Sequence, residues 1–420
     1  MNNPKNRRLV ITISLVVLLL ILGTSAYLAT AVFHVQGINF AAQQATPTLE
    51  PFPSPTPTLP STTTPSSTAM AVPTLPVVTD TRQIMGLDGG QGAVYSGISW
   101  VRIGYPTCGW GDLREAKLKQ TIDNYHQKGV RVLLTICQGP NDARLYRPAQ
   151  LTDAAQGNPD AVQCGNEQMK YDAAVSFLYI PPNRFAEFFD RCEKAMHSVR
   201  PDMPVLLGSL DPHVGGIDYF PLLNQVSYLN QMQSAMNSTV RPGGNWDWRK
   251  QTLGLIDSWH NGWNNGGADA SVNSLQGLFS FWAQQFGVDR NSGQLGKHLW
   301  VVEGTGCFKG CGVNPNNSYQ VATSHILSLI TDVQTSLRYK VPFFFFSGRD
   351  FMDQGTYWPI GVLTVEGRPK PLRQDQAMGV TTLPMSCPSG SVVVSNQIDL
   401  LAKMYQGCQL PGNYVAILMS

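Results

Sequence analysis

Eight short apolar segments alternate with longer amphipathic segments between residues 83 and 350. The apolar segments occupy residues 83–90, 99–105, 130–137, 161–167, 205–211, 253–260, 299–306 and 343–350. Each has the length of a β-strand and ends in small or polar residues. Several intervening segments, such as residues 182–200, carry apolar residues at helical spacing. Near-continuous apolar strands separated by single helices are typical of a parallel sheet covered by helices on both faces.

Eight such units predict a closed (β/α)₈ barrel, the TIM barrel of the α/β class. We place the barrel at residues 81–375, since this fold usually takes about 250 residues or somewhat more. An open, doubly wound sheet is the alternative, but no glycine-rich phosphate loop follows any early strand. Residues 376–420 fit no further unit and are expected to form a small C-terminal extension.

The N-terminus predicts a membrane anchor. Residues 1–8 contain Lys5, Arg7 and Arg8, and residues 9–33 form an uncharged apolar run. About 20 apolar residues are enough for a helix to cross a bilayer, so residues 9–33 are expected to be a transmembrane helix. The basic residues favour a cytoplasmic N-terminus and an extracytoplasmic remainder in a single-pass cell-membrane protein. The alternative is a signal peptide cleaved near residues 29–31, which would give a secreted protein.

The segment at residues 34–80 contains a long stretch rich in Pro, Ser and Thr. Such a stretch buries too little apolar surface to offset its loss of entropy, so we expect a disordered linker. Only 14% of the chain is charged, and its formal net charge is +2. With no basic tract after residue 10, the composition argues against a nucleic-acid partner, and we expect a monomer.

The eight cysteines are an even number, as disulfides in an exported protein require. Cys387 and Cys408 lie near each other in the C-terminal segment and are the best candidates for a disulfide. Cys307 and Cys311 could close a small loop, but their spacing is not that of a zinc site. The others, several of them within expected strands or helices, are equally compatible with buried free thiols: Cys108, Cys137, Cys164 and Cys192.

Polar residues stand at the ends of the expected strands, where the active sites of barrels of this kind lie. They are Arg102, Asn166, Glu167, Asp211, His213, His260, Glu303 and Asp350. Glu167 and Glu303 follow the fourth and seventh strands, so they can face each other across the mouth of the barrel. A pair of carboxyl groups is what retaining glycoside hydrolysis needs, one as acid and base and one as nucleophile.

Five motifs, in order along the chain, resemble those of clan A glycoside hydrolases, the superfamily that includes the cellulase-like family 5 enzymes. They are "WVRIGYP" (residues 100–106), "GNEQ" (165–168), "DSWHNGW" (257–263), "VVEGTG" (301–306) and "GVLTVEGRPKPL" (361–372). The resemblance covers residues 82–373. It departs from the family pattern at Gln138, Gln168, Gly262 and Phe346-Ser347, which leaves the pair of glutamates intact and the substrate open.

The resemblance implies a role for each matching residue. Glu167 would be the general acid and later the base, and Glu303 would be the nucleophile. Asn166 would hold the sugar 2-hydroxyl, where hydrogen bonds strengthen in the transition state. Arg102 would hydrogen-bond the nucleophile and keep it charged, and His260 would help to orient the site.

Tryptophans near the expected loops are candidates for stacking against sugar rings. They are Trp110, Trp246, Trp248, Trp259, Trp263 and Trp358, and we expect two or three of them to line the cleft. Trp263 and Trp358 are our candidates for substrate binding. The "NWDW" segment (residues 245–248) is the most attractive candidate for a wall of the cleft.

The sequence thus predicts a retaining glycoside hydrolase that acts on a β-linked oligo- or polysaccharide and needs no metal or organic cofactor. Two alternatives remain. One is a catalytically inactive barrel that binds glycans or associates with the cell wall. The other is a wall-remodelling transglycosylase, which shares the first chemical step but transfers the sugar to another sugar instead of water.

Overall fold

A computed structural model of the chain describes residues 80–89, 95–108, 117–138, 148–169, 179–210, 213–214, 218–219, 222–257, 274–304, 323–353, 356–375 and 379–419. The predicted N-terminal anchor and the predicted linker, apart from its last residue, Asp80, lie outside these residues. Within the described part of the chain, no helix is both long and apolar enough to span a bilayer. The anchor at residues 9–33 therefore stays a prediction from the sequence.

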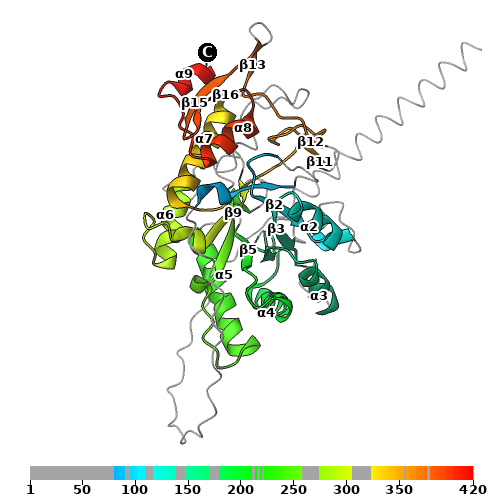
Figure 1. Ribbon diagram of the computed structural model, residues 1–420. Helices are drawn as coiled ribbons and strands as arrows, with labels where there is room; N and C mark the ends of the chain where they lie inside the picture. Colours follow the sequence, from blue (N-terminus) through cyan, green and yellow to red (C-terminus); the bar gives the residue numbers. More distant parts are fainter. Residues whose placement is uncertain are drawn as a thin grey trace, which may run out of the picture. The chain divides into compact units, whose positions relative to one another are not determined.

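Eight parallel strands close into a barrel (Figure 1). In order around it they are β1 (Met85–Asp88), β2 (Trp100–Gly104), β3 (Arg131–Ile136), β4 (Ala161–Cys164), β5 (Val205–Leu210), β8 (Thr252–Asp257), β9 (Leu299–Gly304) and β10 (Phe343–Phe345). The last strand pairs with the first, Met85 opposite Phe343, so the sheet has no free edge. The predicted barrel is confirmed, and the open doubly wound sheet is excluded.

Helices cover the outside of the barrel (Figure 1). Those that connect barrel strands are α2 (Leu118–His126), α3 (Pro148–Gln156), α4 (Pro182–Val199), α5 (Leu222–Ala235), α6 (Leu275–Phe286) and α7 (Thr323–Tyr339). Their apolar faces pack against the outward side chains of the strands; on α4 these include Phe185, Phe188 and Phe189. The short helical turns are η1 (Thr81–Gln83), η2 (Pro106–Cys108), η4 (Met236–Val240), η5 (Trp248–Lys250) and η8 (Leu295–Lys297).

The interior of the barrel is filled by a separate apolar cluster. It consists of Trp100, Leu133, Ala161, Leu206, Ile256, Trp300, Val302 and Phe344. Trp100 and Trp300 meet edge to face with ring centroids 5.3 Å apart, and Trp300 stacks on Phe344 at 6.1 Å. These rings fill the barrel interior, and the polar side chains lie beyond them, at the carboxyl ends of the strands.

The segment after β10 forms small sheets and two helices. The sheets pair β11 (Phe351–Asp353) with β12 (Thr356–Trp358), β13 (Gln374–Asp375) with β14 (Gly379–Val380), and β15 (Leu383–Cys387) with β16 (Gly390–Val394); an earlier one pairs β6 (His213–Val214) with β7 (Asp218–Tyr219). The helices are α8 (Gln397–Tyr405) and α9 (Tyr414–Met419), both packed against α7 (Figure 1). Tyr405 on α8 donates a hydrogen bond to Ser336 of α7.

Among the described residues, three disulfides tie neighbouring elements together. Cys307 and Cys311, which could close a small loop, lie outside these residues. Cys387 is bonded to Cys408, as predicted. Cys108 after β2 is bonded to Cys137 after β3, and Cys164 at the end of β4 is bonded to Cys192 on α4. These four cysteines are therefore disulfide-bonded, and the alternative of buried free thiols at these positions is excluded. Both of these disulfides lie beside strand ends that carry the polar cluster described next.

Candidate active site

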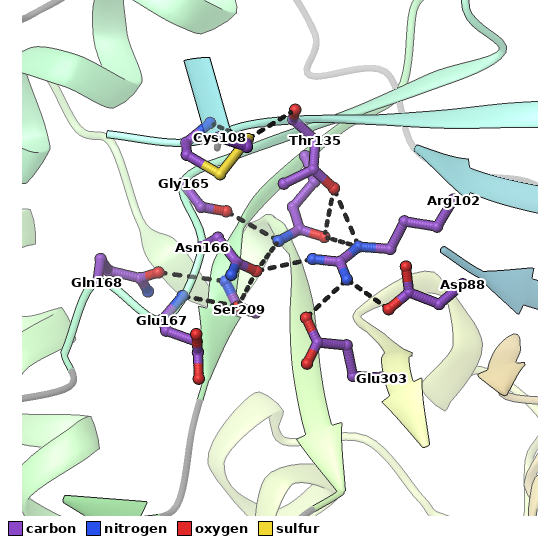
Figure 2. Close-up of polar contacts among 12 residues, drawn as sticks. Asp88, Arg102, Cys108, Thr135, Gly165, Asn166, Glu167, Gln168, Ser209 and Glu303 are labelled. Carbon is purple, nitrogen blue, oxygen red and sulfur yellow. Dashed lines mark hydrogen bonds and ion pairs between the residues drawn. A yellow bond between two sulfur atoms is a disulfide. The ribbon is translucent and has the colours of Figure 1, made fainter. Parts of the chain in front are cut away.

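Arg102 lies at the centre of a buried polar cluster at the carboxyl ends of the barrel strands (Figure 2). Its side chain is fully buried. Nη1 donates to Asp88 Oδ2 at 2.8 Å and to Glu303 Oε1 at 2.7 Å, and Nη2 donates to Asn166 Oδ1 at 2.7 Å. One guanidinium thus joins the ends of four strands and brings together three of the predicted site residues.

The third nitrogen of the guanidinium is held by neutral side chains. Nε donates to Thr135 Oγ1 at 3.0 Å and to Gln163 Oε1 at 3.2 Å. Gln163 is fixed in turn by its own NH₂ group, which donates to the carbonyl of Gly165 at 2.8 Å. Thr135 and Gln163 were missed in the sequence, although a polar residue inside an otherwise apolar buried strand was a signal that could have found them.

Alternation along the strands places most of this cluster in the barrel. On β2, Arg102 stands two residues beyond the interior Trp100, so both face inward. Asp88 is the register partner of Arg102 on β1. Asp88 was also missed, although it ends the first expected strand as clearly as Glu303 ends the seventh.

Glu303 reaches the interior because β9 carries a bulge at Val302. Val301 pairs with Leu255 of β8, but the next pair is Ile256 with Glu303, which leaves Val302 as an extra residue. Val302 and Ile256 both line the barrel interior. Regular alternation would point Glu303 outward toward the helices. The bulge turns it inward, onto Arg102.

A second irregularity, at Gly208 on β5, positions Ser209. Leu207 and Ser209 pair with consecutive residues of β8, so Gly208 is the extra residue. Gly208 has a left-handed backbone, with φ of 51°, and a Cβ there would lie 2.4 Å from Gln168 Oε1. Only glycine fits both the conformation and the space. Gln168, the residue after Glu167, uses the same oxygen to accept a hydrogen bond from the Ser209 N–H.

Ser209 holds both residues of the Asn-Glu pair. Its hydroxyl donates to Asn166 Oδ1 at 3.0 Å and accepts from the Glu167 N–H at 2.9 Å. Glu167 needs this support, because its φ of 47° lies in the left-handed region that non-glycine residues rarely adopt. Its carboxyl group points away from the guanidinium of Arg102 (Figure 2).

The amide of Asn166 is oriented by its neighbours. Its oxygen accepts from Arg102, from Ser209 and, at 3.3 Å, from Gln163 Nε2. Its backbone is clamped by Gln138, whose oxygen accepts from the Asn166 N–H at 2.9 Å and whose NH₂ donates to the Asn166 carbonyl at 2.7 Å. Because the side-chain oxygen already accepts three hydrogen bonds, the side-chain NH₂ group is the part of Asn166 that can bind a ligand, as a hydrogen-bond donor.

With Asp88 and Glu303 both ionised, the cluster around Arg102 has two negative charges and one positive charge. Burial raises the pKa of Asp88 to about 7; the charge of Arg102 opposes the shift and that of Glu303 adds to it. Burial also disfavours the cation of Arg102, but Asp88 and Glu303 outweigh it and raise the pKa of Arg102. Among the described residues, no group of three or more His, Cys, Asp or Glu side chains could hold a metal ion.

Asp350, another predicted strand-end acid, belongs to a different cluster. It pairs with Lys370 at 2.6 Å and accepts from Tyr357 and from the N–H of Gly361. Burial raises the pKa of Asp350 and lowers that of Lys370, and each partner opposes the shift of the other. These contacts tie the end of β10 to the segment that carries the last sequence motif.

Other predicted residues lie where the structure does not describe them. Trp110, Asp211, Trp259, His260 and Trp263 fall outside the described residues. Two more have only their backbone described: His213 opens β6, and Trp358 ends β12. The predicted roles of His260, Trp263 and Trp358 therefore stay predictions.

The "NWDW" segment does not form a wall of the cleft, and that prediction was wrong. Trp248 lies in η5, immediately before β8, so it sits at the opposite end of the barrel from the polar cluster. It is fully buried against Trp282 and Phe286 of α6, and Trp246 packs on Phe189 of α4. The segment connects a helix to the next strand, and such connections lie at the amino ends of parallel strands.

Replacing Ser209 with alanine is expected to lower the free energy of unfolding by about 1–3 kcal/mol, because it removes the buried hydroxyl that accepts from Glu167 and donates to Asn166. Urea unfolding measures the change. Ser280→Ala is the control, since that hydroxyl donates to a carbonyl within its own helix, α6, and accepts from Arg290, and both bonds are exposed. Equal stability of the two variants would contradict a supporting role for Ser209.

Comparison with known proteins found no matching family model and no matching curated protein. Solved structures that are similar include the GH53 catalytic domain of Ignisphaera aggregans, at 13% identity over 71% of this chain and 96% of that one, with a TM-score of 0.43. A GH128 endo-β-1,3-glucanase from Amycolatopsis mediterranei, in complex with laminaripentaose, has 13% identity over 69% and 95%, with a TM-score of 0.40.

A third similar structure is a GH5_18 protein from Streptomyces cattleya in complex with GlcNAc, at 12% identity over 65% of this chain and 68% of that one, with a TM-score of 0.39. These neighbours are clan A glycoside hydrolases, the group that the sequence motifs resemble. The likeness concerns the fold. The link to family 5 stays an inference from the motifs, and the chemistry of this chain rests on its own residues.

Proposed function

We propose that this chain is a retaining glycoside hydrolase that cleaves a β-linked glycan, with Glu303 as nucleophile and Glu167 as general acid and base. One observation carries the proposal. The guanidinium of Arg102 holds Glu303 through one nitrogen and Asn166, the residue before Glu167, through another. Two distant motifs of the sequence are thereby fixed around one buried cation at the mouth of a barrel.

The nucleophile role suits Glu303 better than Glu167. The salt bridge to Arg102 favours the ionised form of Glu303 and limits the rotation of its carboxylate. Its side chain is still 16% exposed, so it is open to a ligand, unlike the buried Asp88. The carboxyl group of Glu167 points away from the guanidinium of Arg102, which suits a group that must give and take a proton (Figure 2).

The first step breaks the glycosidic bond. An oxygen of the Glu303 carboxylate donates an electron pair to the anomeric carbon and forms an ester. The bond from that carbon to the leaving oxygen breaks, and its electron pair goes to the oxygen. The carboxylic acid of Glu167 supplies the proton that the oxygen takes up.

The second step hydrolyses the ester. The Glu167 carboxylate takes a proton from a water molecule, whose oxygen attacks the anomeric carbon. The ester bond breaks and its electron pair returns to Glu303. Two inversions at the anomeric carbon leave the β configuration unchanged. During both steps the NH₂ group of Asn166 is placed to donate to a sugar hydroxyl, since its oxygen is already held by three donors.

The configuration of the first product tests the proposal. We expect the purified protein to release the β anomer from a β-linked glycan, because the reaction proceeds through a glycosyl ester. A panel of β-1,3- and β-1,4-linked oligosaccharides, followed by ¹H NMR within the first minutes, measures this before the anomers interconvert. An α anomer as first product would contradict the mechanism.

The same experiment separates the alternatives. Oligosaccharides longer than the substrate would identify a transglycosylase, which forms the same ester. Binding in calorimetry without any product would favour an inactive glycan-binding barrel. A boiled sample and the Glu303→Gln variant serve as controls for contaminating glycosidases.

A further inference from the structure

Asp88 and Glu303 share a single nitrogen of Arg102. Nη1 donates one hydrogen bond to each carboxylate, at 2.8 Å to Asp88 and 2.7 Å to Glu303 (Figure 2). The two acids differ in exposure, since the side chain of Asp88 is 2% exposed and that of Glu303 is 16% exposed. The mechanism proposed above gives Glu303 a role and leaves Asp88 without one.

We propose that Asp88 is a positioning residue that becomes the counter-ion of Arg102 when Glu303 is consumed as a glycosyl ester. The inference rests on the proposed function, because it requires that ester. Beyond that function, it assigns Glu303 a buried partner, Asp88, which becomes negatively charged when Glu303 loses its negative charge.

The charge balance explains why such a partner is needed. In the resting protein, ionised Glu303 already balances Arg102, so a second ionised carboxylate would give the buried cluster a net negative charge. Asp88 therefore tends to keep its proton, in agreement with the rise of its pKa to about 7. Among the described residues, the charged groups that face Asp88 are Arg102 on β2 and Glu303 on β9; after β10, Gly348 gives only a backbone hydrogen bond.

Formation of the ester reverses this balance. Glu303 becomes a neutral ester, and the buried cation of Arg102 loses the carboxylate charge that balanced it, which is a costly change. Asp88 then releases its proton to water and pairs with Arg102 through the contact it already makes. When the ester is hydrolysed, Glu303 regains its charge and Asp88 takes a proton back from water. The proton on the leaving oxygen comes from Glu167 throughout, so the two proton movements are separate.

Asp88→Asn tests the inference, because asparagine preserves the shape and removes the charge. The probes are 2,4-dinitrophenyl 2-deoxy-2-fluoro-β-glycosides of glucose, mannose, galactose and the β-1,3- and β-1,4-linked glucobioses, which separate formation of the ester from its hydrolysis. We expect Asp88→Asn to slow formation of the ester by about tenfold or more, since it removes the charge that replaces Glu303. We expect the hydrolysis of the ester not to be slowed, because that step restores the charge of Glu303.

A purely structural role for Asp88 predicts a different result. It would slow both steps alike or neither, and either outcome overturns the inference while leaving the proposed function intact. Asp350→Asn is the matched control: it removes one charge from another buried pair after a barrel strand, without touching Arg102. Asp88→Glu keeps the charge and is expected to restore part of the rate of ester formation. If the wild-type protein forms no ester with any probe, the proposed function fails, and this inference fails with it.

The resting protein offers a second measurement that needs no activity. A group whose pKa is raised on folding stabilises the protein at low pH, and this contribution is lost as pH rises through the raised pKa. Wild type should therefore lose stability relative to Asp88→Asn as pH rises from about 4 to 7. Melting temperatures over this range measure the difference and also establish that the variant folds. A difference independent of pH would mean that Asp88 is ionised throughout and would overturn the inference.

Discussion

Replacing Glu303 with alanine is expected to lower turnover on the order of 10⁴-fold, and added azide is expected to restore product as an α-glycosyl azide. The loss follows because Asp88, the other carboxylate on the same nitrogen of Arg102, is only 2% exposed and therefore closed to a ligand. Azide fits the space of the missing side chain and attacks from the same face. With no ester intermediate there is only one inversion, so a β-glycan gives the α product. NMR of the isolated azide measures the configuration.

Glu167→Ala provides the matched comparison. With an activated aryl β-glycoside, which needs no acid, Glu303 still forms the ester in this variant. Azide then replaces water in the second step and gives the β-glycosyl azide after two inversions. The two variants thus predict azides of opposite configuration. Turnover of Glu303→Ala within about tenfold of wild type would show that Glu303 is not the nucleophile.

The Glu303 variants should stay folded, which makes the kinetic result interpretable. Arg102 keeps its contact with Asp88 and with Asn166 when Glu303 is changed. In Glu303→Gln the side-chain oxygen can still accept from Arg102. Circular dichroism and melting temperature are the checks on folding.

Replacing Arg102 with methionine is expected to cost about 3–5 kcal/mol of the free energy of unfolding at pH 7, the largest effect on stability that we predict. The change leaves Asp88 and Glu303 in a buried cluster with no cation and removes a donor from Asn166. Urea unfolding at several pH values measures it. The loss should grow as pH rises above about 7, because Arg102 lowers the pKa of Asp88, so that without Arg102 the Asp88 carboxyl group stays protonated to higher pH than in the wild type.

Arg241→Met is a control with the same pattern of contacts in a different environment. Arg241 also binds two carboxylates, Asp190 and Glu193, each at 2.6 Å, but its side chain is 29% exposed. The two acids are each 9% exposed, but Asp190 keeps its ion pair with Lys194, and water can enter where the partly exposed guanidinium was. We therefore expect a smaller loss, of about 1 kcal/mol. Equal losses for the two arginines would contradict the view that burial makes Arg102 critical.

A double-mutant cycle separates charge from packing at this site. Asp88→Asn removes an acid that has lost its contact with the arginine in Arg102→Met, so at pH values above about 7, where Asp88 ionises, the double variant should be more stable than Arg102→Met alone. No recovery would mean that the lost packing of the arginine, and not the charge of Asp88, causes the effect.

The sequence was sufficient to locate the barrel strands, because a strand buried on both faces must be apolar along its whole length. Seven of the eight predicted segments contain a whole barrel strand of the structure, and the eighth, residues 253–260, misses only Thr252, the first residue of β8. It was sufficient also for the disulfide between Cys387 and Cys408. The sequence was not sufficient to predict which connecting segments lie at the mouth of the barrel. The "NWDW" segment looked like a loop at the mouth, yet Trp248 is packed at the other end, since apolar rings suit both a cleft and a core.

What the sequence determined by itself was the identity and order of the chemical groups: Arg102 on the second strand, Asn166 and Glu167 after the fourth, Glu303 on the seventh. What only the tertiary structure decided was where they point. Alternation alone would have turned Glu303 toward the helices, and the bulge at Val302 turns it onto Arg102. A bulge depends on how two neighbouring strands pair, and residues far apart in the chain determine that pairing.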